Sequence, residues 1–136
     1  MRNTLIDAGP LIALFDRSDS YHLAALRFLE TYEGTLWTTW PVITEVSHML
    51  DFHIQSQINF LKWINRGGIK IVDLSEDHFP RIIQLCEKFD DVPMDLADAT
   101  LIIASEVADI KEIASIDTDF YVYRNVRNEY LTNIFL

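Results

Sequence analysis

The stretch TLIDAGPLIALF, residues 4–15, carries an aspartate, Asp7, in the middle of an apolar run. The residues before Asp7 are typical of the end of a short buried strand. Gly9 and Pro10 predict a turn and the start of a helix, because proline fits where no backbone donor is needed. Asp7 is therefore expected where a strand ends and a helix is about to begin, which in open α/β sheets is the edge that binds ligands. A carboxylate there has two available roles, to cap the turn or to hold a ligand.

Strand and helix patterns alternate along the whole chain. Strands are expected over 3–7, 36–39, 69–74, 112–116 and 130–136. Helices are expected over 10–15, 21–32, 41–50, 55–66, 75–88 and 95–107. This alternation predicts a layered α/β fold with a mostly parallel sheet. A chain of 136 residues without a repeat or linker predicts a single domain over 1–136.

The composition limits the classes of function. A hydrophobic share of 49% is that of a globular protein, and no apolar run approaches the ~18 residues of a membrane span. The single cysteine, Cys86, forms no internal disulfide, which suits the reducing cytoplasm. Eleven basic against 21 acidic residues give a formal net charge of −10, which repels nucleic acid at long range. Chemistry on a phosphodiester therefore needs positive charge brought into the site.

Two aspartates share one face of the helix expected over 95–107, because Asp95 and Asp98 are three residues apart. Asp95 suits the N-cap position as well as a site, and Asp98 suits the first turn, where the helix dipole favours negative charge. The first-turn role explains Asp98 less well, since Ile102 follows it on the same face and a buried unpaired carboxylate is costly. We therefore expect Asp98 to have a cationic partner.

Three further acids need the same weighing of roles. Asp117 ends a strand, as Asp7 does, and its alternative role is in an Asx-turn, a role that suits Asp119 better. Glu45 projects within or beside the apolar stripe of the helix expected over 41–50. Its alternative role is that of an ordinary solvated glutamate near the start of a helix.

Four carboxylates are thus expected at one edge of the sheet, with no lysine or arginine close in sequence: Asp7, Glu45, Asp98 and Asp117. Converging carboxylates repel one another and raise each other's pKa. A hard divalent cation removes this repulsion, and oxygen-only ligands suit Mg²⁺ or Mn²⁺. Because such ions activate water and clamp phosphate oxygens, the pattern predicts metal-dependent chemistry on a phosphodiester.

The blocks that carry these acids are LIDAGPLIALFDRSDSYH, TTWPVITEVSHML, PMDLADATLIIASE and SIDTDF. In this order they resemble the PIN-domain ribonucleases, including the VapC-like toxins of bacterial toxin–antitoxin pairs, over essentially the full length. The resemblance implies a three-layer α/β/α fold with a short parallel sheet. It also implies an endoribonuclease with a Mg²⁺- or Mn²⁺-dependent acidic site, in which the four acids above take the four acidic positions.

The chain departs from many relatives of that family at two positions. Ala8 and Gly9 follow the first aspartate, where many relatives have a hydroxyl residue. Ser115 takes the place of a threonine two residues before the last acid and keeps the hydroxyl. Ser115, Asp95 and Asp119 are additional candidate ligands of the metal.

The resemblance also implies partners, namely an RNA substrate, a second copy in a homodimer, and an antitoxin with a basic segment that wraps the helices near the cleft. The apolar helix over 55–66, which includes Trp63, is expected to contribute to the dimer. Arg124 and Arg127 come nearest to a basic cluster, and we expect them to be scattered surface charge.

More than one function stays open on the sequence alone. A phospho-acceptor signalling domain also has acids at strand ends and needs Mg²⁺, with Asp73 as the acceptor. That fold normally carries paired acids after its first strand and a lysine after its last, whereas here Asp7 stands alone and Lys111 precedes its strand. An RNA-processing PIN nuclease that is not a toxin also stays open, as does a non-catalytic PIN-like binding module.

Overall fold

Five strands form one sheet in the computed structural model, which describes residues 1–136. The strands are β1 (Asn3–Ile6), β2 (Thr35–Thr38), β3 (Lys70–Ile71), β4 (Glu112–Ala114) and β5 (Thr132–Asn133). Their order in the sheet is β3-β2-β1-β4-β5, and every neighbouring pair is parallel. The predicted parallel sheet is therefore confirmed, and it is parallel throughout. The two edge strands, β3 and β5, are shorter than expected, with two residues each.

Six α-helices and two 3₁₀ turns connect the strands. They are α1 (Ala8–Phe15), α2 (His22–Thr31), α3 (Trp40–Met49), α4 (Ile54–Asn65), η1 (Glu76–His78), α5 (Phe79–Lys88), α6 (Leu96–Ala108) and η2 (Thr118–Tyr121). Helix α1 begins at Ala8 rather than at Pro10, because Asp7 already caps it. The helix expected from Ser75 is divided, since the Ser75 side chain caps the 3₁₀ turn η1 and α5 follows.

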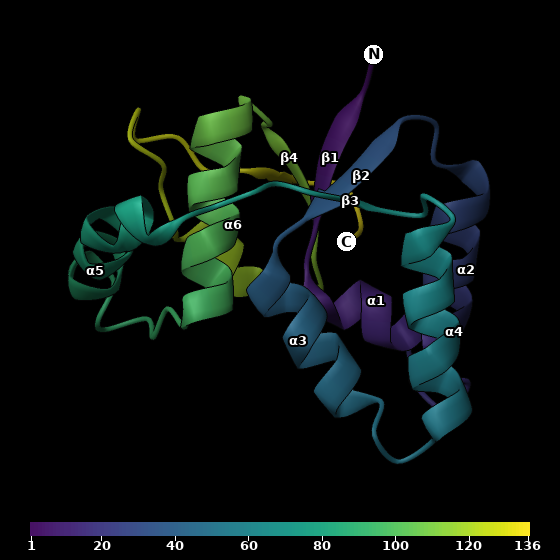
Figure 1. Ribbon diagram of the computed structural model, residues 1–136. Helices are drawn as coiled ribbons and strands as arrows, with labels where there is room; N and C mark the ends of the chain where they lie inside the picture. The colour runs from purple at the N-terminus through teal and green to yellow at the C-terminus, as the bar shows by residue number, and fades with distance from the viewer.

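The helices cover both faces of the sheet. Figure 1 shows α1, α2 and α4 to one side of the strands and α5 and α6 to the other, while α3 packs against both α1 and α6. This arrangement confirms the three-layer α/β/α fold. None of the helices combines the length and the apolar character needed to cross a membrane.

Helix α6 lies deep in the molecule. Every residue from Ala97 to Ser105 is buried, including Leu101, Ile102 and Ile103. Small and branched apolar residues on all sides of a helix are expected where it packs against a sheet and a second helix together. The first turn of α6 is therefore held rigidly in place.

The strand order changes direction at β1, because β2 pairs on one side of it and β4 on the other. In open α/β sheets the crevice at such a switch point, outside the carboxyl ends of the strands, is the usual ligand site. A helix that connects two parallel strands runs back across the sheet, so α6 begins at this same edge. The fold therefore brings the end of β1, the end of β4 and the start of α6 together.

Candidate metal centre

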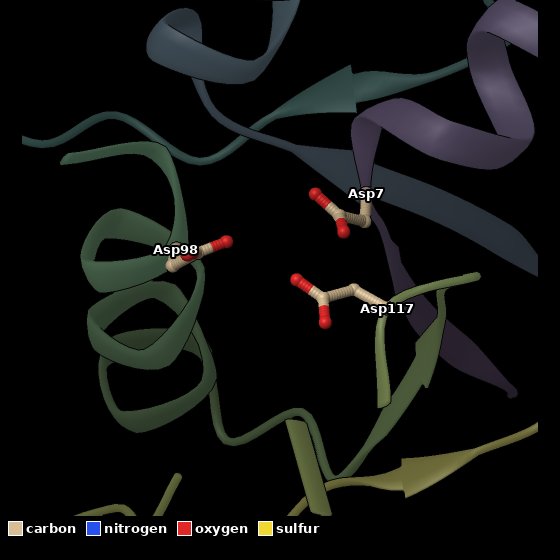
Figure 2. Close-up of side chains that lie close together, drawn as sticks. All are labelled: Asp7, Asp98 and Asp117. Carbon is tan, nitrogen blue, oxygen red and sulfur yellow. The ribbon is translucent and has the colours of Figure 1, made fainter. Parts of the chain in front are cut away.

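Asp7 follows β1 directly and caps α1. Its Oδ1 accepts a hydrogen bond from the backbone N–H of Ala8 at 2.8 Å, and its Oδ2 accepts one from the Ser115 hydroxyl at 2.9 Å. The side chain is buried, with 7% of the residue exposed. The capping role considered for this aspartate is therefore confirmed, and the same carboxylate also points toward Asp98 and Asp117 (Figure 2).

Asp117 is held by Ser115 and by its own turn. The Ser115 hydroxyl oxygen accepts the backbone N–H of Asp117 at 2.9 Å, and Oδ1 of Asp117 accepts the backbone N–H of Asp119 at 2.8 Å. The Asx-turn thus belongs to Asp117, whereas the sequence pattern favoured Asp119 for it. Ser115 touches the first and the last acid at once, so one hydroxyl sets the spacing between them.

Asp98 lies in the first turn of α6, three residues after the N-cap Asp95. The Asp95 carboxylate accepts the backbone N–H of Asp98 at 2.8 Å, so the capping role of Asp95 is confirmed. No side chain supplies the cationic partner expected for Asp98, because it forms no ion pair with a lysine, arginine or histidine. The ion pairs of the molecule lie elsewhere: Arg2–Glu112, His48–Asp51, Arg81–Glu106 and Arg127–Asp109.

The carboxylates of the three aspartates lie close to one another. One carboxylate oxygen from each of Asp7, Asp98 and Asp117 lies within 4.8 Å of the other two. Figure 2 shows that the side chains converge from three directions: the β1–α1 junction, the start of α6 and the segment after β4. Three of the four predicted site residues are therefore brought together.

The electrostatics of this cluster disfavour negative charge. Burial raises the pKa of Asp7 to about 6, against the opposing hydrogen bonds from Ala8 and Ser115. Burial, followed by the charges of Asp95 and Asp7, raises the pKa of Asp98 to about 8. In the absence of a nearby cation these carboxyls hold protons at a pH where exposed ones are ionised. Such a site favours any cation that can replace the protons.

Glu45 stands apart from the three aspartates. It lies on the second turn of α3 and is exposed, yet its charge adds to the rise in the pKa of Asp7. Its own pKa is raised by partial burial and by Asp95. Glu45 therefore lies near the acidic cluster without being part of it. Asp119 also has a raised pKa, caused first by burial and then by the charge of Asp117.

Two residues near the cluster carried no signal in the sequence. Tyr123 is fully buried, and its hydroxyl donates to the backbone carbonyl of Pro93 at 3.0 Å, which ties the segment after β4 to the loop before α6. Burial, and next the charge of Asp98, raise the pKa of this tyrosine. Asn133, in β5, bonds both backbone groups of Ser115. Neither contact could be anticipated, because the partners are 30 and 18 residues apart in the chain.

The donor set fits a hard divalent cation. Each of the three converging side chains offers a carboxylate oxygen, and neither sulfur nor imidazole nitrogen takes part. Oxygen-only donors are those that Mg²⁺ and Mn²⁺ prefer. Because no cationic side chain is among their contacts, the chain itself does not compensate the negative charge that these carboxyls gain when they ionise.

The remaining candidates from the sequence take other roles. Arg124 donates to the carbonyl of Tyr121 at 2.7 Å and lies over the ring of Tyr130, so it braces its own loop. Arg127 is exposed near Asp109. Asp73 is exposed beyond the edge strand β3 and is not part of the carboxylate cluster, which leaves the phospho-acceptor hypothesis without support.

A model of the PIN domain matches residues 4–126 of the chain. The chain belongs to the PIN domain family. The resemblance in the acidic blocks is thereby confirmed at the level of the family. Among curated protein sequences, none matches the chain significantly.

Solved structures of similar fold include VapC toxins. VapC20 of Mycobacterium tuberculosis, a sarcin-ricin loop cleaving toxin, has a TM-score of 0.78 and 16% identity, covering 88% of this PIN domain chain and 93% of its own. A toxin–antitoxin complex from Klebsiella pneumoniae has a TM-score of 0.64 and 20% identity, covering 85% of this chain and 87% of its own. VapBC2 from Rickettsia felis, bound to a DNA fragment from its promoter, has a TM-score of 0.65 and 11% identity. The match covers 96% of this chain and 98% of that one. At these identities the likeness establishes the fold.

Proposed function

We propose that this PIN domain is a Mg²⁺- or Mn²⁺-dependent endoribonuclease and the toxin of a toxin–antitoxin pair. The observation that carries the proposal is the cluster of Asp7, Asp98 and Asp117, whose oxygens lie within 4.8 Å of one another without a cationic partner. Its place at the switch point of the sheet is where the fold usually binds ligands. The resemblance in fold to VapC20, a toxin that cleaves RNA, supports the choice of substrate.

The three clustered aspartates would hold the metal ion, and Glu45 would complete the site from α3. When bound, such an ion lowers the pKa of a coordinated water and offsets charge on phosphate oxygens. Asp7 would be held in place for this role by the hydrogen bonds from Ala8 and Ser115, which fix the orientation of its carboxylate. Glu45 is exposed on α3 and close enough for its charge to raise the pKa of Asp7, so its carboxylate would help to hold the ion or orient a water.

The negative charge of the protein implies that RNA binding would depend on a bound metal ion. A net charge of −10 repels the phosphate backbone, and Arg124 and Arg127 do not form a basic patch. Positive charge at the cleft would come from the bound ion. The same acidity would attract the basic segment of an antitoxin, a partner class suggested by the complexes from Klebsiella pneumoniae and Rickettsia felis.

A homodimer in which α4 contributes completes the proposal. Trp63 packs inside its own chain, with its ring centroid 5.6 Å from that of Phe15. The exposed apolar side chains of α4 form a separate stripe at helical spacing, consisting of Ile54, Ile58 and Leu61. The contribution of this helix to the dimer is therefore assigned to that stripe. The single free cysteine, Cys86, is consistent with a cytoplasmic location.

The deciding experiment is cleavage of a labelled structured RNA by the purified protein with Mn²⁺, with Mg²⁺ and with EDTA. We expect internal cuts with either ion and none with EDTA or with Asp7→Asn. Asp73→Asn serves as the matched control, because it removes an exposed aspartate just beyond β3 and should cut like the wild type. Metal binding without cleavage of any RNA offered would favour the non-catalytic binding module instead.

A further inference from the structure

The C-terminal strand β5 pairs with β4 over a very short ladder. The backbone N–H of Thr132 donates to the carbonyl of Lys111, and that of Ile134 donates to the carbonyl of Ile113, each at 2.9 Å. The chain bends at Ile134, and no backbone hydrogen bond joins β5 to Ser115, the residue that follows β4.

The side chain of Asn133 takes over where the backbone ladder stops. Its Nδ2 donates to the carbonyl of Ser115 at 2.9 Å, and its Oδ1 accepts the backbone N–H of Ser115 at 3.3 Å. The same Oδ1 accepts the backbone N–H of Phe135 at 3.0 Å, which fixes the turn that follows the strand. A carboxamide has the same donor and acceptor as a peptide group. Asn133 therefore acts as a substitute rung of the sheet.

Ser115 is the residue on which the spacing of the first and last acid depends. It is fully buried, its hydroxyl donates to Oδ2 of Asp7 at 2.9 Å, and the hydroxyl oxygen accepts the N–H of Asp117 at 2.9 Å. Its two backbone groups are held by Asn133. A continuous path of hydrogen bonds thus runs from the edge strand β5 through Ser115 to the carboxylate of Asp7 and to the backbone N–H of Asp117.

We infer that Asn133 is a positioning residue of the acidic centre, acting through Ser115, and that docking of β5 is coupled to metal binding. The metal part of this inference rests on the proposed function. Outer contacts of metal ligands typically change metal affinity about 10- to 100-fold when they are removed. Coupling between two sites is reciprocal, so a bound ion must stabilise the Asn133–Ser115 contacts as much as those contacts favour the ion.

The first test compares Asn133→Ala with Asn125→Ala by calorimetric titration with Mn²⁺. Asn125 is a matched control, because its Oδ1 accepts two backbone N–H groups, from Arg127 and Glu129, in an exposed turn with no contact to Ser115. We expect about a tenfold or greater loss of Mn²⁺ affinity for Asn133→Ala and no change for Asn125→Ala. Equal affinities for the two variants would overturn the inference.

A double-variant cycle with Ser115→Ala asks whether Asn133 acts through the hydroxyl. We expect the losses of Mn²⁺ affinity for Asn133→Ala and Ser115→Ala to be non-additive, because both act on one path. Additive losses would show that Asn133 acts by another route. If Asn133→Ala does not fold, Asn133→Asp replaces it, since it keeps the acceptor for Ser115 and Phe135 and removes the donor.

Hydrogen exchange tests the reciprocal effect on the unaltered chain. Mn²⁺ should slow exchange of the amides of Ser115 and Phe135, while the amides of Arg127 and Glu129 should exchange as before. Uniform slowing or no slowing in a protein that binds Mn²⁺ would contradict the coupling.

If the wild type binds no Mn²⁺, the proposed function and the metal part of the inference both fail, and a crystal structure of Asn133→Ala then decides the positioning role. A Ser115 hydroxyl displaced from Asp7 would support the inference. A contact kept at 2.9 Å would overturn it.

Discussion

Asp95 and Asp98 each bond the backbone N–H of the other at the first turn of α6. Oδ1 of Asp95 accepts from the Asp98 N–H at 2.8 Å, and Oδ2 of Asp98 accepts from the Asp95 N–H at 3.3 Å. Their surroundings differ, because Asp95 is exposed while Asp98 is 9% exposed and belongs to the carboxylate cluster. We therefore propose separable roles for the two aspartates of this capping box, structural for Asp95 and ligand-binding for Asp98.

The variant Asp98→Asn should separate these roles. Asparagine keeps an oxygen that can accept from the Asp95 N–H, and it removes a buried carboxyl whose ionisation beside Asp7 is unfavourable. We expect the metal-free variant to be at least as stable to urea as the wild type. Stabilisation by Mn²⁺, about 2.7 kcal/mol at roughly one hundred times the dissociation constant, should be lost.

The control for this prediction is Asp95→Ala. Loss of the N-cap should lower the free energy of unfolding by about 1 kcal/mol and leave stabilisation by Mn²⁺ in place. If Asp98→Asn instead unfolds the metal-free protein, Asp98 is a structural cap rather than a ligand.

The stability of the metal-free protein should fall as the pH rises. The folded protein raises the pKa of Asp7 to about 6 and that of Asp98 to about 8, from an ordinary value of 3.8. At a pH between the ordinary pKa and the raised pKa of each carboxyl, the folded state keeps a proton that the unfolded chain has released. The free energy of unfolding therefore decreases as the pH rises through this range. Urea unfolding in EDTA should therefore show higher stability near pH 5 than near pH 8, and Mn²⁺ should remove most of the difference.

The double variant Asp7→Asn/Asp98→Asn isolates the source of this pH dependence. It lacks the two buried carboxyls but keeps the other acidic residues. The change of its unfolding free energy with pH therefore reports the repulsion among those other acidic residues. We expect its stability to change less between pH 5 and pH 8 than that of the wild type. A slope as steep as that of the wild type would place the effect outside the cluster.

The sequence was sufficient to predict the fold and the three clustered acids, because both depend on local patterns. Asp7 and Asp117 follow apolar strand segments, and Asp98 follows a cap, so the parallel sheet brings them to one edge. The pattern around Asp98 predicts a cationic partner without naming it, and no basic side chain takes that role. Asn133 was not found at all, because its role appears only where β5 turns away from β4.

Gly9 keeps the start of α1 close to the segment that carries Asp117. A Cβ atom on Gly9 would lie 3.1 Å from Cδ1 and 3.2 Å from Cβ of Ile116, between Ser115 and Asp117. Alanine in a helix gains up to about 1 kcal/mol over glycine, so we expect Gly9→Ala to change stability little. Calorimetry should nevertheless show weaker Mn²⁺ binding, because Ile116 must move. Adding Ile116→Ala removes Cδ1 and should restore part of the Mn²⁺ affinity. Unchanged Mn²⁺ affinity in Gly9→Ala would show that the segment around Ile116 moves aside without disturbing Asp117.

The exposed stripe of α4 should support the dimer. Sedimentation of the wild type at micromolar concentration should give twice the 15.8 kDa of the chain. Ile58→Glu places a charge in the middle of the stripe and should give a monomer of unchanged fold. Val107→Glu is the control, because Val107 is an exposed apolar residue near the end of α6, away from α4. A wild type that sediments as a monomer would reject the dimer.

The ends of the cleaved RNA should identify the attacking group. The proposed site, with Asp7, Asp98 and Asp117 around an ion, activates water, so the 2′-hydroxyl of the RNA takes no part. Mass spectrometry should therefore find a 5′-phosphate and a 3′-hydroxyl at each cut, and a single 2′-deoxy substitution at the scissile nucleotide should not prevent cleavage. Cleavage through the 2′-hydroxyl would instead leave a 2′,3′-cyclic phosphate and would be blocked by that substitution. Cyclic ends, or cutting undiminished by EDTA and by Asp7→Asn, would exclude hydrolysis at the carboxylate cluster.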